Sequence, residues 1–327
     1  MSLMEEQLAE LRTLAARAEN RMTATGIPRV AMVQGKIPEH ELAAVYDPMV
    51  NLILRGSKSM TVGDRTLHYC PANYFVMSVD LPAVGTVWPA ASGEPYLAVA
   101  LTLQPDIIAA LLADLPKFAD NEKAETGFSV AAVTPALMDA WVRMLRLMNH
   151  PEDVPALAPV YEREILYRVL QGPQGGMLRE IARPDSAMAR VSLAIQWIRR
   201  DFAAPLRIGA LAERAAMSES AFHRHFKAIT ALSPLQYQKR IRLLQARTLL
   251  VVGGRSVTAA ALEVGYESAT QFSREYARAF GLPPARDSER LLSAYAPRLE
   301  EEPSPRPSRP SRTATDGANR AAAAYAG

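Results

Sequence analysis

Hydrophobic and polar positions follow two different rhythms along the 327 residues of this chain. From Arg29 to Leu103, short apolar runs are separated by Gly, Pro, Asn and Asp, which predicts β-strands joined by turns. The expected strands are residues 29–34, 49–55, 58–62, 65–69, 74–79, 83–88 and 96–103. Gly63-Asp64 is a hairpin turn, since glycine tolerates positive φ. Many short strands at this spacing favour a sandwich or a barrel.

Positions with helical periodicity precede and follow this strand-rich stretch. Apolar residues that recur at intervals of three and four predict amphipathic helices. The expected helices are residues 4–22, 105–115, 135–149, 160–171, 186–202, 206–215, 219–229, 234–250, 257–264 and 268–280. In helix 135–149 one apolar stripe is formed by Leu137, Trp141, Leu145 and Met148. This stripe either packs onto the strands of its own chain or forms a seam between two copies, because paired stripes also hold helices together.

One pattern is written twice between residues 206 and 286. The residues Phe222, Arg224 and Phe226 are matched, at one constant spacing, by Phe272, Arg274 and Tyr276. Each copy reads as a short helix, a turn and a second helix. The simplest interpretation is a repeated helix-turn-helix, in which the second helix of each copy is the recognition helix.

The outward face of each recognition helix supplies the candidate DNA-binding residues. Phe222 and Phe226 stand at i and i+4, so they face the core and leave the other side chains outside. The outward residues are Ser220, His223, Arg224 and Lys227 in the first helix, and Ala269, Thr270, Gln271 and Arg274 in the second. Such side chains can reach base edges and phosphates. Because the second face has fewer charges, we expect the first motif to anchor the protein and the second to adjust specificity.

Charge is distributed unevenly along the chain. Residues 187–292 contain 16 Lys and Arg against 8 Asp and Glu, whereas residues 1–186 contain 16 against 22. A basic C-terminal half indicates contact with a polyanion. The linking helix 234–250 contributes Lys239, Arg240, Arg242 and Arg247. We expect these four side chains to be solvated, with one or two of them contacting a DNA phosphate.

The chain lacks the residues that catalysis would need. Of its five histidines, only His68 falls in an expected barrel strand, so the sequence predicts no metal site and no cofactor. His223 and His225 diverge on a helix and cannot share a metal. No Ser-His-Asp arrangement or Gly-rich phosphate loop is present. A barrel enzyme fused to a DNA-binding domain is therefore a weaker alternative, and we predict that the chain is not an enzyme.

Cys70 is the single cysteine of the chain. It allows no intrachain disulfide, and it excludes a repair methyltransferase sensor, which needs a cysteine cluster. We expect Cys70 to be buried and to pack like a small hydrophobic residue, and the alternative is a redox-sensing thiol. Inside the expected barrel, a small-ligand pocket is predicted from aromatic and polar residues. The candidate effector-binding residues are His40, Tyr46, Arg55, Tyr74, Trp88 and Tyr96.

Several sequence motifs in the C-terminal half resemble those of the AraC/XylS family of bacterial transcription regulators. They are Phe222-x-Arg224-x-Phe226-Lys227, Ser233-Pro234-x-x-Tyr237, Gly265-Tyr266-Glu267-Ser268, Phe272-Ser273-Arg274 and Gly281-x-Pro283-Pro284. Residues 46–56, 63–69 and 75–82 are similar to the cupin-like sensor domain of that family. Three positions depart from its usual pattern: Ala231 replaces Gly, Ala277 replaces Lys, and Arg286-Asp287 replaces Tyr-Arg. The first departure predicts a less regular end to the first recognition helix, and the second removes a phosphate contact.

The resemblance implies an α+β chain of two domains. A cupin-like β-barrel with flanking helices is expected over residues 1–183 as the sensor and dimerisation domain, and an all-α double helix-turn-helix over 184–292. A disordered tail is expected over 293–327, because its Pro, Ser, Arg and Ala cannot form a core. No apolar run approaches the ~20 residues that span a membrane, and no signal peptide is legible, so we expect a cytoplasmic protein.

These features predict a sequence-specific regulator of transcription, controlled by a small organic effector in the barrel. The expected partners are promoter or operator DNA, the effector, a second copy of the chain through helix 135–149, and RNA polymerase. The alternative from the same residues is a ligand-independent regulator whose barrel serves only for dimerisation.

Overall fold

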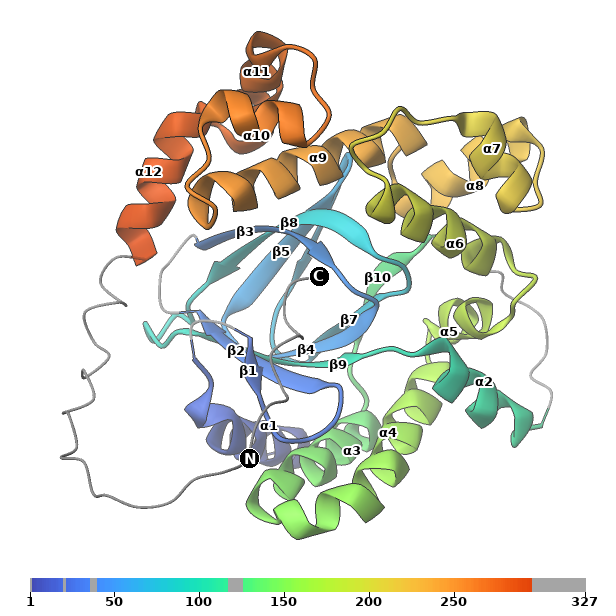
Figure 1. Ribbon diagram of the computed structural model, residues 1–327. Coiled ribbons are helices and arrows are strands. Elements are labelled where there is room, and N and C mark those ends of the chain that lie inside the picture. Colours follow the sequence, from blue (N-terminus) through green and yellow to red (C-terminus); the bar gives the residue numbers. More distant parts are fainter. Residues whose placement is uncertain (1, 20–21, 36–39, 117–125, 296–327) are drawn as a thin grey trace, which may run out of the picture.

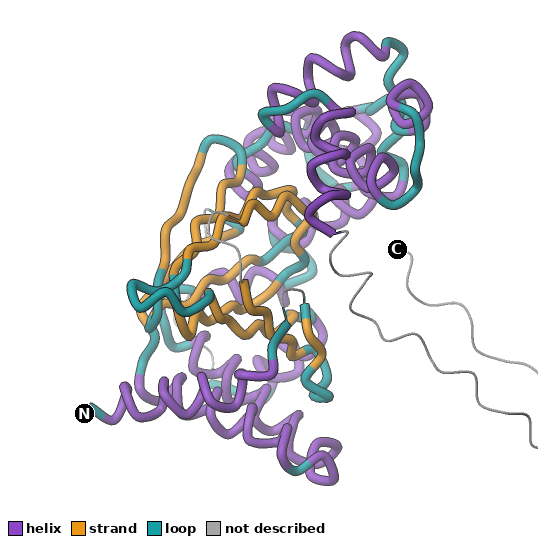
Figure 2. The backbone as a smooth tube through the Cα atoms, turned by 90° about the vertical axis from the view of Figure 1, so that its left-hand side faces the viewer, coloured by secondary structure: helices purple, strands orange, loops and turns teal. Residues whose placement is uncertain are grey.

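The computed structural model describes residues 2–19, 22–35, 40–116 and 126–295. Seen from the side, these residues form three tiers, with helices above and below a layer of strands (Figure 2). The predicted α+β class is confirmed. Of the predicted tail, residues 296–327 lie outside the described part of the chain.

The strands form two antiparallel sheets. The six-stranded sheet has the order β1 (Thr23–Ala24), β2 (Val30–Gly35), β9 (Tyr96–Thr102), β4 (Met49–Arg55), β7 (Asn73–Met77) and β10 (Phe128–Ala132). The four-stranded sheet has the order β3 (His40–Tyr46), β8 (Leu81–Trp88), β5 (Ser57–Val62) and β6 (Arg65–Tyr69). The sheets face each other, because a Cβ added at Gly35 would lie 3.0 Å from the Val87 side chain. The described strands therefore make a sandwich of two sheets rather than one closed barrel.

The described α-helices of the N-terminal part lie beside the six-stranded sheet, several of them at the bottom of Figure 1. They are α1 (Leu3–Leu14), α2 (Pro105–Ala113), α3 (Pro135–Arg146), α4 (Val154–Leu170) and α5 (Gly175–Ala182). Helix α3 packs against α1 and α4, and its Trp141 is fully buried. Leu137, Leu145 and Met148 are buried there too. The predicted dimer seam over 135–149 is therefore wrong for this stripe, because helices of the same chain cover it.

In the described residues of the C-terminal part, up to residue 295, all regular elements are helices (Figure 1). The first motif is formed by α6 (Ala187–Arg200), α7 (Ile208–Arg214) and α8 (Glu219–Thr230), and the linking helix is α9 (Pro234–Val251). The second motif is formed by α10 (Val257–Glu263), α11 (Ala269–Phe280) and α12 (Pro284–Tyr295). The buried core runs without a break from the sandwich into the first motif, whereas the second motif has a core of its own.

Several elements differ from the sequence prediction, among them β1 and α5, which the pattern does not predict as a strand and a helix. The first helix ends at Leu14, and β3 and β10 are strands that the pattern does not predict. The prediction ends the helices at residue 280, yet Pro284 is the first residue of a further helix, α12. Proline suits the first turn of a helix, where its missing N–H would have no partner in any case.

Candidate nucleic-acid interface

Both recognition helices, α8 and α11, begin in the same way. The Ser218 hydroxyl accepts a hydrogen bond from the Ala221 amide at 3.3 Å, and the Ser268 hydroxyl accepts one from the Gln271 amide at 3.3 Å. Each serine satisfies a backbone N–H that the first turn of a helix leaves free. Phe222 in α8 and Phe272 in α11 are fully buried, so each helix turns the same face to its core.

On each of these two helices, the structure places the predicted DNA-binding residues on the face opposite the buried phenylalanine. The exposed ones are Ser220, His223, Arg224 and Lys227 on α8, and Thr270, Gln271 and Arg274 on α11. Ala269 is half-buried. The two faces differ in charge as the sequence implies, because three of the four α8 residues are basic or imidazole side chains. Their contacts with DNA remain a prediction.

The ends of the two recognition helices are alike. Ala231 adopts a left-handed φ of 58°, and Gly281 adopts a φ of 78°. The Ala231 amide donates to the Lys227 carbonyl at 2.9 Å, and the Gly281 amide donates to the Ala277 carbonyl at 2.8 Å. The predicted irregular end of α8 is therefore wrong. Alanine adopts the conformation of the usual glycine, at a cost of about 1–2 kcal/mol.

Helix α9 binds the two motifs together through Arg242. Its guanidinium donates to the Phe202 carbonyl at 2.8 Å, beyond the end of α6. It also donates to the Gly265 carbonyl at 3.0 Å, in the turn between α10 and α11 of the second motif. Gly265 itself has no room for a side chain, since a Cβ there would lie 2.2 Å from the Ala203 carbonyl oxygen. Arg242 therefore sets the relative position of the two motifs and is not the solvated side chain that we predicted.

The other basic side chains of α9 are also partly or fully removed from solvent. Lys239 forms an ion pair of 2.7 Å with Glu275 of α11, and burial lowers the pKa of Arg240. Arg247 is buried, and its Nε lies 2.8 Å from the Asp287 carboxylate. The expected solvation is therefore wrong for Arg242 and Arg247, whereas Lys239 and Arg240 are half-buried, and the expected contact of one or two side chains of this helix with a DNA phosphate stays a prediction.

A groove of about 460 Å³ lies between the two motifs. Its cationic lining comes from Lys227 of α8, Lys239 and Arg240 of α9, and Arg278 of α11. Two residues of the N-terminal domain, Gly63 and Asp64, also line it. Basic side chains from three helices of a double helix-turn-helix form the kind of surface that attracts a phosphate backbone.

The hairpin turn at Gly63-Asp64 docks against the end of the first recognition helix. A Cβ added at Gly63 would lie 2.4 Å from the Ala231 carbonyl oxygen, so only glycine permits this approach. Nearby, the Gly127 amide donates to the Ile229 carbonyl at 3.0 Å. Asp64 and Arg65 share a second hollow with His223 and Arg224. The N-terminal domain therefore reaches the edge of the candidate DNA-binding face.

A second contact between the domains is centred on Asp80, just before β8. Arg199 of α6 donates to the Asp80 carboxylate at 2.5 Å, and Tyr237 of α9 donates its hydroxyl to the Asp80 carbonyl at 2.8 Å. Asp47 lies 3.5 Å from the same arginine. Burial raises the pKa of the Asp80 carboxyl to about 6, against the opposing effect of the Arg199 charge. Strand β8, which follows Asp80, thus connects the sandwich to the helices that carry the DNA-binding face.

The predicted effector-binding residues do not all lie together. Tyr96 is buried between the sheets, and Tyr46 lies beside Lys58, whose Nζ is 5.0 Å from the Tyr46 ring. The backbone of His40 belongs to β3, but its side chain lies outside the described part of the structure.

Three predicted effector-binding residues are corrected. Arg55 is held by Glu94 at 2.5 Å and by the Pro95 carbonyl at 2.9 Å. The Tyr74 hydroxyl points away from the sheet interior, toward Gly172 after α4. Trp88 alternates with the inward-facing Val87, so it lies on the outer face of β8. Alternation along a strand could have separated these residues, but it required the correct register.

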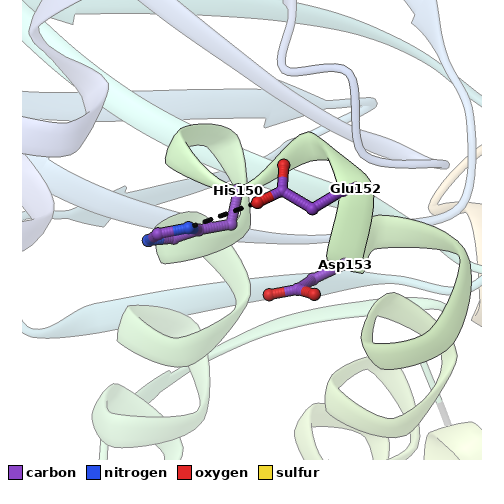
Figure 3. Close-up of side chains that lie close together, drawn as sticks. All are labelled: His150, Glu152 and Asp153. Carbon is purple, nitrogen blue, oxygen red and sulfur yellow. Dashed lines mark ion pairs between the residues drawn. The ribbon is translucent and has the colours of Figure 1, made fainter.

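Outside these regions, the described residues include one group of three side chains that are close enough to share a metal ion. The group consists of His150, Glu152 and Asp153 (Figure 3). All three are exposed, and the His150 Nδ1 lies 3.7 Å from a Glu152 oxygen. Exposed acidic groups often lie this close together without binding an ion, so we assign no metal to this surface cluster. Cys70 is exposed, so the expectation of a buried hydrophobe is wrong.

Comparison with known proteins identifies the family. A family model described as the N-terminus of AraC-type transcriptional regulators matches residues 26–177, and one described as a helix-turn-helix domain matches residues 211–290. The chain belongs to the AraC-type transcriptional regulators. The resemblance inferred from the motifs is thereby confirmed. AraC-type proteins are regulators, which agrees with the prediction that the chain is not an enzyme.

Two curated AraC-type relatives are HTH-type transcriptional activators named RhaS. RhaS of Escherichia fergusonii is 34% identical over 143 residues, which are 42% of this chain and 51% of RhaS. RhaS of Escherichia coli strain SE11 is 32% identical over 144 residues, which are 44% of this chain and 50% of RhaS. The chain thus spans about half the length of the curated relatives it matches.

A solved structure extends the likeness over both parts of the AraC-type chain. Wild-type ToxT from Vibrio cholerae, with an unsaturated fatty acid bound, has a TM-score of 0.52 and covers 80% of this chain and 93% of its own. Its sequence identity is 11%, so the likeness concerns the fold alone. No described helix is both long and apolar enough to cross a lipid bilayer.

Replacing Gly63 with alanine tests the docking of the hairpin. The variant should free the hairpin from α8, because the new methyl group would overlap the Ala231 carbonyl oxygen. Amide hydrogen exchange should then become at least about tenfold faster at Gly127, whose amide donates to the Ile229 carbonyl. Gly93→Ala is the matched control, since Gly93 has a similar φ of 83° but nothing within 4 Å of an added Cβ. Equal exchange in both variants would show that the hairpin does not depend on this contact.

Proposed function

We propose that this AraC-type chain is a transcription activator that binds promoter DNA through both helix-turn-helix motifs. The observation that carries the proposal is the pair of exposed recognition faces, on α8 and α11, that one helix holds in place. The groove between them adds Lys239, Arg240 and Arg278 to the basic surface. Phosphates would meet these side chains, while the outward residues of α8 and α11 would read bases.

The two recognition helices would enter successive major grooves on one side of the duplex, about 34 Å apart. That geometry requires a rigid connection, and Arg242 supports it because it donates to carbonyl groups of both motifs. The first motif would anchor the complex, since His223, Arg224 and Lys227 give it more positive or imidazole side chains than α11 offers. We therefore expect the bound site to be asymmetric, with stronger base preference in one half.

Replacing Arg224 with alanine tests the assignment of the reading face. The expected loss is about 1–3 kcal/mol of binding free energy, because a bidentate contact between arginine and guanine contributes about that discrimination. Binding of the full chain would be measured by fluorescence anisotropy at one fixed salt concentration, on duplexes selected from a random library. Arg255→Ala is the control. Arg255 is exposed in the loop between α9 and α10, and its replacement removes the same charge. Unchanged affinity and base preference in Arg224→Ala would contradict the assignment.

We also propose that a small organic effector binds between the two sheets and changes the arrangement of the domains. The solved ToxT structure holds a fatty acid, which shows that a protein of this fold accepts such a ligand. In this chain, the Asp80–Arg199 pair and the docked hairpin are the contacts through which a change in the sandwich would reach α6 and α8. The effector acts only if its affinity differs between the two arrangements.

Titration calorimetry with a broad panel of sugars, amino acids, organic acids and alcohols tests this part of the proposal. Binding by any member, together with a change in DNA affinity, supports effector control. If nothing binds, and a C-terminal fragment activates transcription as well as the full chain does, the N-terminal domain is instead a ligand-independent module.

A homodimer, contact with RNA polymerase and a cytoplasmic location also belong to the proposal. Because α1 and α4 of the same chain cover α3, we propose that a second copy would bind at another surface of the N-terminal part. Sedimentation of the full chain with and without operator DNA gives the oligomeric state. Transcription in vitro with purified polymerase shows whether the chain activates directly.

A further inference from the structure

One lysine lies in the interior of the N-terminal sandwich. Lys58 stands on β5 and pairs with Val87 on β8 and with Tyr69 on β6, so the three side chains share one face of the sheet. Val87 points to the opposite sheet, since it lies 3.0 Å from a Cβ added at Gly35. Lys58 therefore faces inward, and only 7% of its surface is exposed.

Within the described part of the chain, this buried ammonium group has no carboxylate partner. Its aromatic neighbour is the Tyr46 ring, whose centroid lies 5.0 Å from Nζ. Burial lowers the pKa of Lys58 to about 8, so the side chain still carries its charge at neutral pH. A buried charge is strongly unfavourable unless another group compensates it. An aromatic face compensates a cation only in part.

Neutral phenol groups surround the same position. Tyr96 comes from the opposite sheet, is 2% exposed, and its hydroxyl has no hydrogen-bond partner among the described residues. Tyr69 reaches the Asn51 side chain only at 3.5 Å. Burial raises the pKa of Tyr46, Tyr69 and Tyr96, so all three keep their protons. A hydroxyl that retains its proton can donate a hydrogen bond, and a buried one without a partner is costly.

We propose that Lys58 and Tyr96 bind the anionic group of the effector, and that this group is the carboxylate of a small organic acid. The proposal rests on the proposed function, since it names the chemistry of the ligand for that same sandwich. One lysine balances one negative charge, so a carboxylate fits better than a phosphate dianion. Lys58 Nζ would form the ion pair, and Tyr96 Oη would donate a hydrogen bond to the second oxygen. Met60, Phe75 and Val87 are buried around the cluster and would contact an apolar body.

The test compares acids with neutral compounds of the same shape. Benzoate, phenylacetate and octanoate are titrated into the full chain at constant ionic strength, beside benzamide, phenylacetamide and octanamide. Thermal shift and calorimetry report binding to wild type, Lys58→Met, Tyr96→Phe and Tyr74→Phe. The Tyr74→Phe variant is the matched control, because Tyr74 is a buried strand tyrosine whose hydroxyl points away from the sheet interior.

The expected result is that at least one acid binds wild type more tightly than its amide does, and that Lys58→Met lowers the affinity for this acid about ten- to one-hundred-fold. Tyr96→Phe should give a smaller loss and Tyr74→Phe none. Tyr96→Phe also keeps the test decisive if Lys58→Met fails to fold. If no acid binds better than its amide, or if both sandwich variants bind acids as wild type does, the carboxylate assignment is wrong. Binding of amides or sugars alone would overturn that assignment while leaving effector control intact.

Discussion

Replacing Asp287 with asparagine is expected to destabilise the second helix-turn-helix by about 3–5 kcal/mol, because it leaves a buried arginine without its counter-charge. Asp287 of α12 is fully buried and accepts hydrogen bonds from Arg247 at 2.8 Å and from the Tyr276 hydroxyl at 2.9 Å. Arg290 donates to the same carboxylate at 2.9 Å. One side chain thus ties the linking helix, the second recognition helix and the last helix together.

Asp287→Asn would be studied by native-state hydrogen exchange across residues 234–295, since the second motif has its own core and can open separately. Asp201→Asn is the control, because Asp201 is exposed and pairs with the exposed Arg200 at 2.7 Å, so its loss should change stability by less than about 1 kcal/mol. A loss of only that size in Asp287→Asn would contradict the central role of this carboxylate.

The pH dependence of the second motif has a definite sign. Burial acts to raise the pKa of Asp287, but the hydrogen bonds from Arg247, Arg290 and Tyr276 outweigh it, so the pKa is lowered overall from 3.8. The folded form then holds its proton less tightly than the unfolded form does. The stabilisation is present above the unfolded pKa and is lost as the pH falls through the folded pKa. The Asn variant should lack this acid-dependent loss.

Replacing Lys58 with methionine is expected to raise the stability of the ligand-free protein at pH 7 by about 3 kcal/mol. Burial lowers the pKa of Lys58 from 10.5 to about 8, and every tenfold loss of proton affinity corresponds to about 1.4 kcal/mol of disfavoured charge. Methionine has a similar length and no charge to desolvate, so it removes this unfavourable contribution. Urea denaturation of the purified full chain, followed through the N-terminal domain, measures the change.

The same lysine gives a second, independent signature. Its pKa is lower in the folded protein than in the unfolded chain, so between about pH 8 and 10.5 the unfolded chain holds more protons. Wild-type stability should therefore rise with pH across that window, and this rise should be absent from Lys58→Met. Lys227→Met is the control, because Lys227 is exposed on α8 and its replacement should produce neither effect. A destabilised Lys58→Met protein with unchanged pH dependence would show that the charge of Lys58 is already compensated.

A stabilising substitution at Lys58 would indicate that the residue is kept for binding rather than for folding. Functional sites often hold groups that lower the stability of the empty protein. Under the proposed carboxylate assignment, the effector supplies the missing counter-charge. The ligand would then restore the stability that wild type lacks, and it would have no such effect on Lys58→Met.

The reading faces of the two motifs could be predicted from the sequence because they depend on local spacing. Phe222 and Phe226 lie one helical turn apart, and burying them turns Arg224 outward whatever else the chain does. The same argument applies to Phe272, Tyr276 and Arg274. The serine caps of both helices are equally local, since each hydroxyl bonds an amide three residues on.

The pocket residues are predicted less well because strand register depends on distant pairings. The pattern predicts the strands that contain Lys58 and Val87 but not that these strands pair, and it does not predict strand β3, which places His40 opposite Val87. Without that register, the sequence assigns Tyr74 and Trp88 to the interior and omits Lys58 and Tyr69. A shift of one residue moves a side chain to the other face of a sheet, so composition alone cannot select the inward set.

By itself, the sequence determined that this chain has a strand-rich half followed by two helix-turn-helix motifs, which of their side chains face outward, and which family they resemble. These properties follow from periodicities within single elements. Only the tertiary structure decided that Asp80 meets Tyr237, 157 positions away, that Arg247 meets Asp287, and that Gly63 reaches the end of α8. Such contacts join residues far apart in the chain, and their partners are chosen by how the elements pack rather than by any local pattern.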